Sequence, residues 1–214
     1  RKAYPHVTLA ARGRKKEQLS AQGLLLHSDY QGELAVRPMA VCEASGLPPQ
    51  DIIFLCVKNY SLEEACREIA PAVTENTIIV PVMNGVDPGQ RVRDFLGKGT
   101  VVDALIYIVA FANADGSITQ QGDFADLYVG IGRASSEEQE KVEAVHRLLA
   151  NAGIDCRTAP DIEAAIWKKY ILNCAFNVLT AYYNEPIGLL RKDPIKREEY
   201  AQLVQEAYLV AKAK

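Results

Sequence analysis

The segment 51–85, DIIFLCVKNYSLEEACREIAPAVTENTIIVPVMNG, decides the fold class of this chain. It opens with the apolar run 51–57 and closes with a second such run, 77–82. Continuous apolar runs of this length are typical of parallel strands that are buried on both faces. The stretch 61–69 between them has a helical pattern. A strand, a helix and a strand at this spacing predict a right-handed βαβ unit.

The helix in this unit has sequence signals at both ends. Ser61 is followed three residues later by Glu64, which predicts a capping box, and Pro71 marks the end of the helix. The sequence on either side extends the alternation. We expect further strands at 7–11, 22–26, 32–36, 101–112, 126–131 and 154–158, and a helix at 136–150. A basic loop is expected at 12–16, and a turn at Asp115-Gly116. The strands at 22–26 and 32–36 are expected at a sheet edge.

The pattern changes near Pro160. The segments 161–181 and 193–214 are both helical in pattern, and no strand is expected there. We therefore expect an α/β domain at 1–160 and the start of an all-α domain at 161–214. The chain begins just before a strand and stops within a helical run, so we expect that residues are missing at both ends, including a first βα unit.

Composition excludes several classes of protein. The 214 residues are 49% hydrophobic and 24% charged, as in ordinary globular proteins, and the net charge of −3 argues against a nucleic-acid surface. No apolar run approaches the roughly 18 residues of a membrane-spanning helix, and the first residues do not resemble a signal peptide.

The cysteines and histidines indicate no metal site. The five cysteines form no CxxC pair, and with only three histidines a zinc site is not expected. Cys56 and Cys174 lie in apolar runs, where we expect them to be buried. This usage is typical of a reducing, cytoplasmic compartment.

Polar residues recur at helical spacing within the apolar stretch 166–181, IWKKYILNCAFNVLTA. Lys169, Asn173 and Asn177 are four residues apart, so they share one helix face, which Thr180 extends. One interpretation is a solvated face. The other is a ligand site, because asparagine is a mediocre helix former and buried polar groups need partners.

Three further polar residues follow expected strands. Lys58 and Asn84 end the two strands of the βαβ unit, where open α/β sheets bind ligands, although Asn-Gly alone is also a common turn. Arg12 follows the strand 7–11. In a dinucleotide fold an arginine there accommodates the 2′-phosphate of NADP, but a solvated basic loop is the alternative. The chain contains no GxGxxG motif.

The order of these motifs resembles the ketopantoate reductase family. The most specific part is WKKYILNCAFNVLTA, 167–181, and FLCVK, VMNGV and NEPIGLL follow the family's order. The resemblance extends from Val7 into the last helix. It implies an N-terminal Rossmann-type dinucleotide-binding domain, an all-helical substrate and dimerisation domain, and NADPH-dependent reduction of 2-dehydropantoate to pantoate in pantothenate and coenzyme A biosynthesis.

The resemblance also implies roles for single residues. Lys169 would be the general acid, and Asn84, Asn173 and Asn177 would bind the substrate. The NADP(H) contacts would come from Arg12, Lys58 and Asn84.

Other functions remain open at this point. They are reduction of another 2-keto acid with NAD(P)H, a dehydrogenase of the 6-phosphogluconate or glycerol-3-phosphate type, and a non-catalytic NADP-binding sensor. The phosphate-substrate enzymes would need a basic cluster in the helical domain, and we interpret Lys192, Lys196 and Arg197 as a solvated face instead. Apolar residues of the last helix need cover, which missing C-terminal helices or a second subunit could supply, and of these we favour a homodimer.

Overall fold

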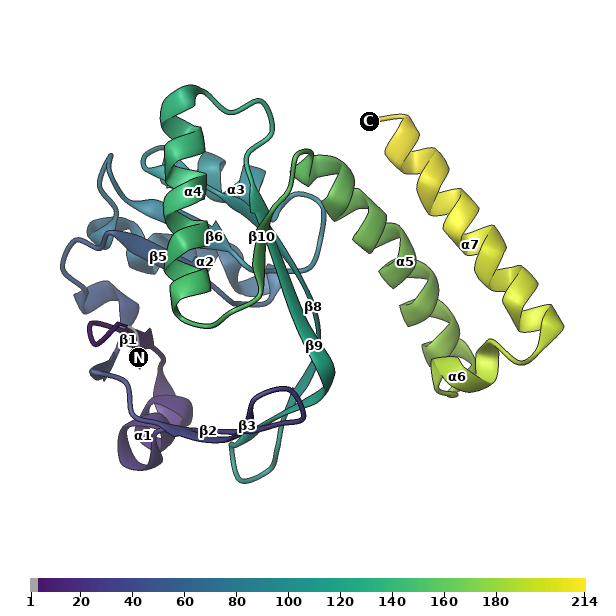
Figure 1. The fold of residues 1–214 in the computed structure, drawn as a ribbon, viewed down its shortest axis with the longest axis horizontal. Helices are drawn as coiled ribbons and strands as arrows, with labels where there is room; N and C mark the ends of the chain where they lie inside the picture. Colours follow the sequence, from purple (N-terminus) through teal and green to yellow (C-terminus); the bar gives the residue numbers. More distant parts are fainter. Residues whose placement is uncertain (1–3) are drawn as a thin grey trace. The chain divides into compact units, whose positions relative to one another are not determined.

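The computed structural model describes residues 4–214, which fall into two compact units. The first runs through Ile162 and contains the strands, and the second, from Glu163 to Lys214, contains helices alone (Figure 1). The expected class, a parallel α/β part followed by a helical part, is confirmed.

The strands of the structure are β1 (Thr8–Ala10), β2 (Leu24–Ser28), β3 (Gly32–Val36), β4 (Ala40–Cys42), β5 (Ile52–Leu55), β6 (Ile78–Pro81), β7 (Thr100–Val101), β8 (Asp103–Ala112), β9 (Ile118–Gly130) and β10 (Cys156–Thr158). The α-helices are α1 (Gly13–Gln22), α2 (Leu62–Ile69), α3 (Pro88–Leu96), α4 (Ser136–Asn151), α5 (Ile162–Tyr183), α6 (Ile187–Leu190) and α7 (Pro194–Lys212).

The βαβ unit forms as the sequence predicts. β5 and β6 are parallel, with Ile52 opposite Ile78 and Leu55 opposite Pro81, and α2 connects them. Every residue of β6 is buried, because β7 pairs on its other side and helices cover both faces. The segment 51–85 therefore builds the centre of the first unit.

Two hydrophobic cores lie on opposite faces of this sheet. Ile79 packs with Leu62 of α2 and Val92 of α3, while its neighbour Val80 packs with Val142 of α4. Successive side chains of β6 point to opposite faces of the sheet, so this one strand packs against helices on both faces.

The remaining strands form two other sheets. β1 pairs with β4 in parallel, and β9 is parallel to both β10 and β2 but antiparallel to β8. The strand expected at 126–131 is the end of a much longer one. β2 lies between β9 and β3, so only β3 of this pair is the edge strand that we expected.

The expected capping box of α2 is wrong. Ser61 is the N-cap residue, but its side chain accepts no capping hydrogen bond, and the Glu64 carboxylate, which would complete the box, is bound to Arg12. A capping box does form at α4, where Ser135 and Glu138 exchange the two hydrogen bonds.

Two other local expectations are also wrong. The basic segment 12–16 is not a loop but opens α1, with Lys16 paired to Glu43 at 3.1 Å. Cys56, the residue after β5, is exposed rather than buried, as is Phe54 two residues before it. Within the described residues β5 is the edge of its sheet. Cys174 is half-buried.

The second unit is an antiparallel helix pair. The chain turns through α6, and α7 runs back beside α5 (Figure 1). The rings of Phe176 and Tyr200 join the two helices at 5.0 Å between centroids, and the Tyr183 hydroxyl donates to Glu199 at 2.6 Å. Across residues 4–214, no helix has the length and apolar character needed to cross a membrane.

Candidate active site

The polar residues of the first unit lie where parallel strands end. Arg12 follows β1 and is the N-cap residue of α1, Lys58 follows β5, and Asn84 follows β6. All three are exposed. The Asn59 side chain donates to the Asn84 carbonyl oxygen at 2.8 Å, which holds the ends of β5 and β6 together. The residue beside Lys58 is therefore bonded to Asn84.

Arg12 is held by two carboxylates of α2. Its Nη1 and Nη2 donate to the two Glu64 oxygens at 2.7 and 2.8 Å, and Nη1 also donates to Glu68 at 2.9 Å. The hydrogen bond and the charge of Arg12 lower the pKa of Glu64, and Glu64 in turn raises the pKa of Arg12. The guanidinium already makes the planar, two-pronged contact with which arginine binds a phosphate.

These groups fit a dinucleotide cofactor. Open α/β sheets bind ligands at the carboxyl ends of their strands, which is where Arg12, Lys58 and Asn84 lie. Gly85, next to Asn84, has φ 121°, and a side chain there would come within 3.2 Å of Asn59 Nδ2. A glycine lets the turn after β6 adopt this backbone, which sets the position of Asn84.

The polar stripe of the second unit lies on α5. Lys169 is buried with 9% of its surface exposed, whereas its neighbour Lys168 is exposed. One turn further on, Asn173 is half-buried, and Asn177 after it is exposed. The stripe therefore runs from a buried ammonium group to a solvated amide. A purely solvated face would not bury its lysine.

Burial changes the acidity of this lysine. Desolvation of the ammonium group lowers the pKa of Lys169 below its ordinary value of 10.5. Thr180 extends the stripe, and its hydroxyl donates a hydrogen bond to the Phe176 carbonyl oxygen at 2.7 Å. Chemically, α5 offers a proton donor near an amide that can orient a polar ligand.

The sequence missed the partners of these residues. Asn59 binds Asn84, and Glu64 and Glu68 bind Arg12. None of the three was predicted as a site partner, and Glu64 was assigned to a capping box instead. The sequence signal that could have indicated partners for Arg12 was the pair of glutamates, Glu64 and Glu68, one turn apart on the helix after Lys58. Among the described residues, no group of three or more His, Cys, Asp and Glu side chains is placed to hold a metal ion.

Comparisons with known proteins agree on one family. Residues 1–134 match the family model described as ketopantoate reductase PanE/ApbA, and residues 161–214 match the model of its C-terminal part. A 2-dehydropantoate 2-reductase of Mesorhizobium japonicum is 26% identical over 97% of this chain and 68% of its own length. The chain spans between 53% and 68% of the length of three curated relatives that it matches.

Solved structures give the same result. The crystal structure of 2-dehydropantoate 2-reductase from Porphyromonas gingivalis matches with a TM-score of 0.80 and 30% identity, covering 94% of this chain and 69% of that one. A D-mandelate dehydrogenase, solved with NADH and anilino(oxo)acetate, has a TM-score of 0.83 at 19% identity over 99% of this chain and 68% of its own. The second likeness concerns the fold alone.

Proposed function

Because the chain belongs to the ketopantoate reductase family, whose relatives are oxidoreductases, we propose that its protein reduces 2-dehydropantoate to pantoate with NADPH. This reaction would supply pantothenate and coenzyme A biosynthesis. The observation that carries the proposal is the buried Lys169 with a lowered pKa, one turn before Asn173 on α5. A solvated helix face gives no reason for either feature.

Lys169 is the proposed general acid. Reduction of a keto group develops negative charge on the carbonyl oxygen, and a protonated amine can stabilise this charge and donate the proton. A lysine whose pKa is lowered toward the working pH transfers its proton more readily. Lys168 is the weaker candidate because it is exposed and faces about 100° away on the helix.

The asparagines are the proposed substrate contacts. Asn173 and Asn177 would orient the carboxylate and hydroxyl ends of the keto acid, and Asn84 would contact both substrate and cofactor. Neutral amides donate and accept hydrogen bonds without competing with Lys169 for charge.

Arg12 and Lys58 are the proposed cofactor contacts. When bound, NADPH supplies the hydride for the reduction. Arg12 would exchange its carboxylate partners for the 2′-phosphate, and Lys58 would contribute positive charge at the end of β5. In this proposal residues 1–160 form the dinucleotide-binding domain, and residues 161–214 start the substrate domain, which would also form a homodimer.

A second candidate is reduction of another 2-keto acid with NADH or NADPH. The D-mandelate dehydrogenase of the same fold was solved with NADH. The arrangement of Lys169 and Asn173 supports the reaction class, reduction of a keto acid, more strongly than it supports any particular keto acid as the substrate. A non-catalytic NADP-binding sensor is less favoured, because such a protein has no need of a buried lysine on α5.

The test is oxidation of NADPH, followed by absorbance, with ketopantoate and a panel of other 2-keto acids, and with NADH as a control. We expect turnover of ketopantoate with NADPH in preference to NADH. Turnover of a different keto acid would replace the substrate but keep the reaction. Binding of NADPH without turnover of any keto acid would favour the sensor.

A further inference from the structure

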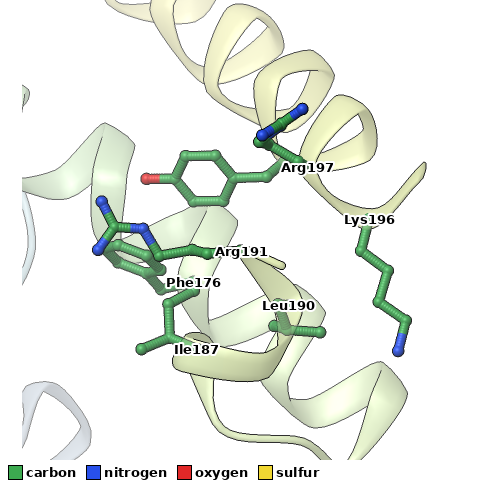
Figure 2. Close-up of a pocket in the computed structure, with 7 residues that line it drawn as sticks. Phe176, Ile187, Leu190, Arg191, Lys196 and Arg197 are labelled. Atoms are coloured by element: carbon green, nitrogen blue, oxygen red, sulfur yellow. The ribbon is translucent and has the colours of Figure 1, made fainter. Parts of the chain in front are cut away.

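The helical unit contains a cavity that the proposed reaction does not use. It has a volume of about 410 Å³ and lies among α5, α6 and α7 (Figure 2). Its apolar lining comes from Phe176, Ile187, Leu190 and the ring of Tyr200. This volume is in the range of small-molecule sites, and an apolar lining with a few polar groups is typical of them.

Three cations line the same cavity, and one of them is already neutralised. Lys196 donates to Glu185 at 2.6 Å and lies over the ring of Tyr183, 4.4 Å from its centre. In Figure 2 its side chain extends away from Arg191. It is half-buried, so the interpretation of this region as a solvated face was wrong for Lys196.

The two arginines keep their charge available. Within residues 4–214, neither Arg191 nor Arg197 forms an ion pair with a carboxylate. Arg191 lies at the end of α6 and Arg197 in the first turns of α7, so two different elements bring them to one cavity (Figure 2). Burial raises the pKa of Tyr200, against the opposing effect of the Arg191 charge, so its phenol remains a neutral donor.

We propose that this cavity binds a small organic anion, with its apolar body against Phe176, Ile187 and Leu190 and its carboxylate or phosphate held by Arg191 and Arg197. A neutral ligand would gain nothing from the two positive charges, and an inorganic anion would gain nothing from the apolar lining. Charge-assisted hydrogen bonds from two arginines favour a head group that accepts several bonds.

The test is calorimetric titration of the 214-residue chain at low ionic strength with three probes. These are 4-phenylbutyrate, phenyl phosphate and the uncharged 4-phenylbutanol. We expect one saturable site for at least one of the two anions, and the tighter of them identifies the head group. In the double variant R191Q/R197Q, affinity should fall about tenfold or more, because two charge-assisted bonds are lost.

Two other variants separate this site from general effects. K192Q removes an exposed neighbouring charge outside the cavity lining and should leave the affinity unchanged. I187W fills the cavity and should weaken all three probes. Circular dichroism checks that each variant is folded. Arg191, Lys192 and Arg197 are exposed, and substitutions at exposed positions change stability little.

Several results would overturn the proposal. They are no saturable binding of either anion, equal affinity for 4-phenylbutanol and 4-phenylbutyrate, unchanged binding in R191Q/R197Q, and an equal loss in K192Q. The first would mean that the cavity accepts no such ligand. The next two would show an apolar crevice alone, and the last a general effect of positive charge.

Discussion

Lys169 and Lys168 are adjacent lysines that differ in burial, so substitutions at the two positions form a matched pair. Lys169 is buried and Lys168 is exposed. We expect K169A to lower kcat by about 10²–10⁴-fold, the usual contribution of a positioned general acid, and K168A to change it little. Steady-state kinetics with the keto acid that the protein turns over best, together with NADPH binding, checks this. Equal kcat in K169A and the parent would remove Lys169 from the mechanism.

The proposed role of Lys169 as general acid predicts a pH dependence of definite sign. A general acid must be protonated, so kcat should decrease as the pH rises through the Lys169 pKa. Because burial lowers this pKa, the decrease should begin below the ordinary lysine value of 10.5. A pH profile of kcat at saturating substrate measures the midpoint. A kcat that stays constant up to the ordinary lysine range would contradict the assignment.

In the proposed function, Glu64 and Glu68 would compete with the 2′-phosphate of NADPH for Arg12. Both carboxylates hydrogen-bond the guanidinium, so the phosphate would have to displace them. We expect E64Q/E68Q to bind NADPH a few-fold more tightly, with a smaller change for NADH, since exposed ion pairs are weak. Fluorescence titration of both cofactors provides the measurement. E63Q is the control, because Glu63 pairs with Arg67 on the same helix. A gain of the same size in E63Q would point to overall charge instead.

At the scale of single elements, the two serines that begin α2 and α4 should differ in importance. The Ser135 side chain accepts a hydrogen bond from the Glu138 backbone, whereas Ser61 makes no such bond. S135A should therefore lower the free energy of unfolding by about 1 kcal/mol, and S61A should change it by less than about 0.5 kcal/mol. Thermal or urea unfolding of both variants measures the difference. A larger loss in S61A would contradict the assigned caps.

The elements differ in how well their sequence predicts them. β5, α2 and β6 were predictable because apolar runs and a helical pattern alternate over a short stretch. The same serine and glutamate spacing occurs at Ser61 and Ser135, but only Ser135 forms the box, and the Glu64 carboxylate instead bonds Arg12, which is distant in sequence. α3 was missed because its sequence, PGQRVRDFL, is short and opens with proline and glycine, which are typical of turns.

At the scale of the whole molecule, the sequence predicts which residues belong to the candidate site but not their partners. The four-residue spacing of Lys169, Asn173 and Asn177 follows from helix geometry alone, so α5 presents them on one face as expected. The contacts of Arg12 with α2 and of Asn59 with Asn84 join segments that are far apart in sequence. Burial of Lys169 also depends on packing, which a local pattern does not encode.

The distribution of buried side chains predicts how the two units fold on their own. Both hydrophobic cores lie within the first unit, whereas in the described part of the second only Ala175, Leu179 and Leu190 are buried apolar residues. We expect the fragment 1–162 to unfold cooperatively, with a Tm close to that of the whole chain. The fragment 163–214 should show little helix by circular dichroism and no cooperative transition, because short helices without a core are marginal in water. Cooperative unfolding of 163–214 would mean that contacts within this helix pair suffice, and that its stability comes from pairs such as Phe176 with Tyr200.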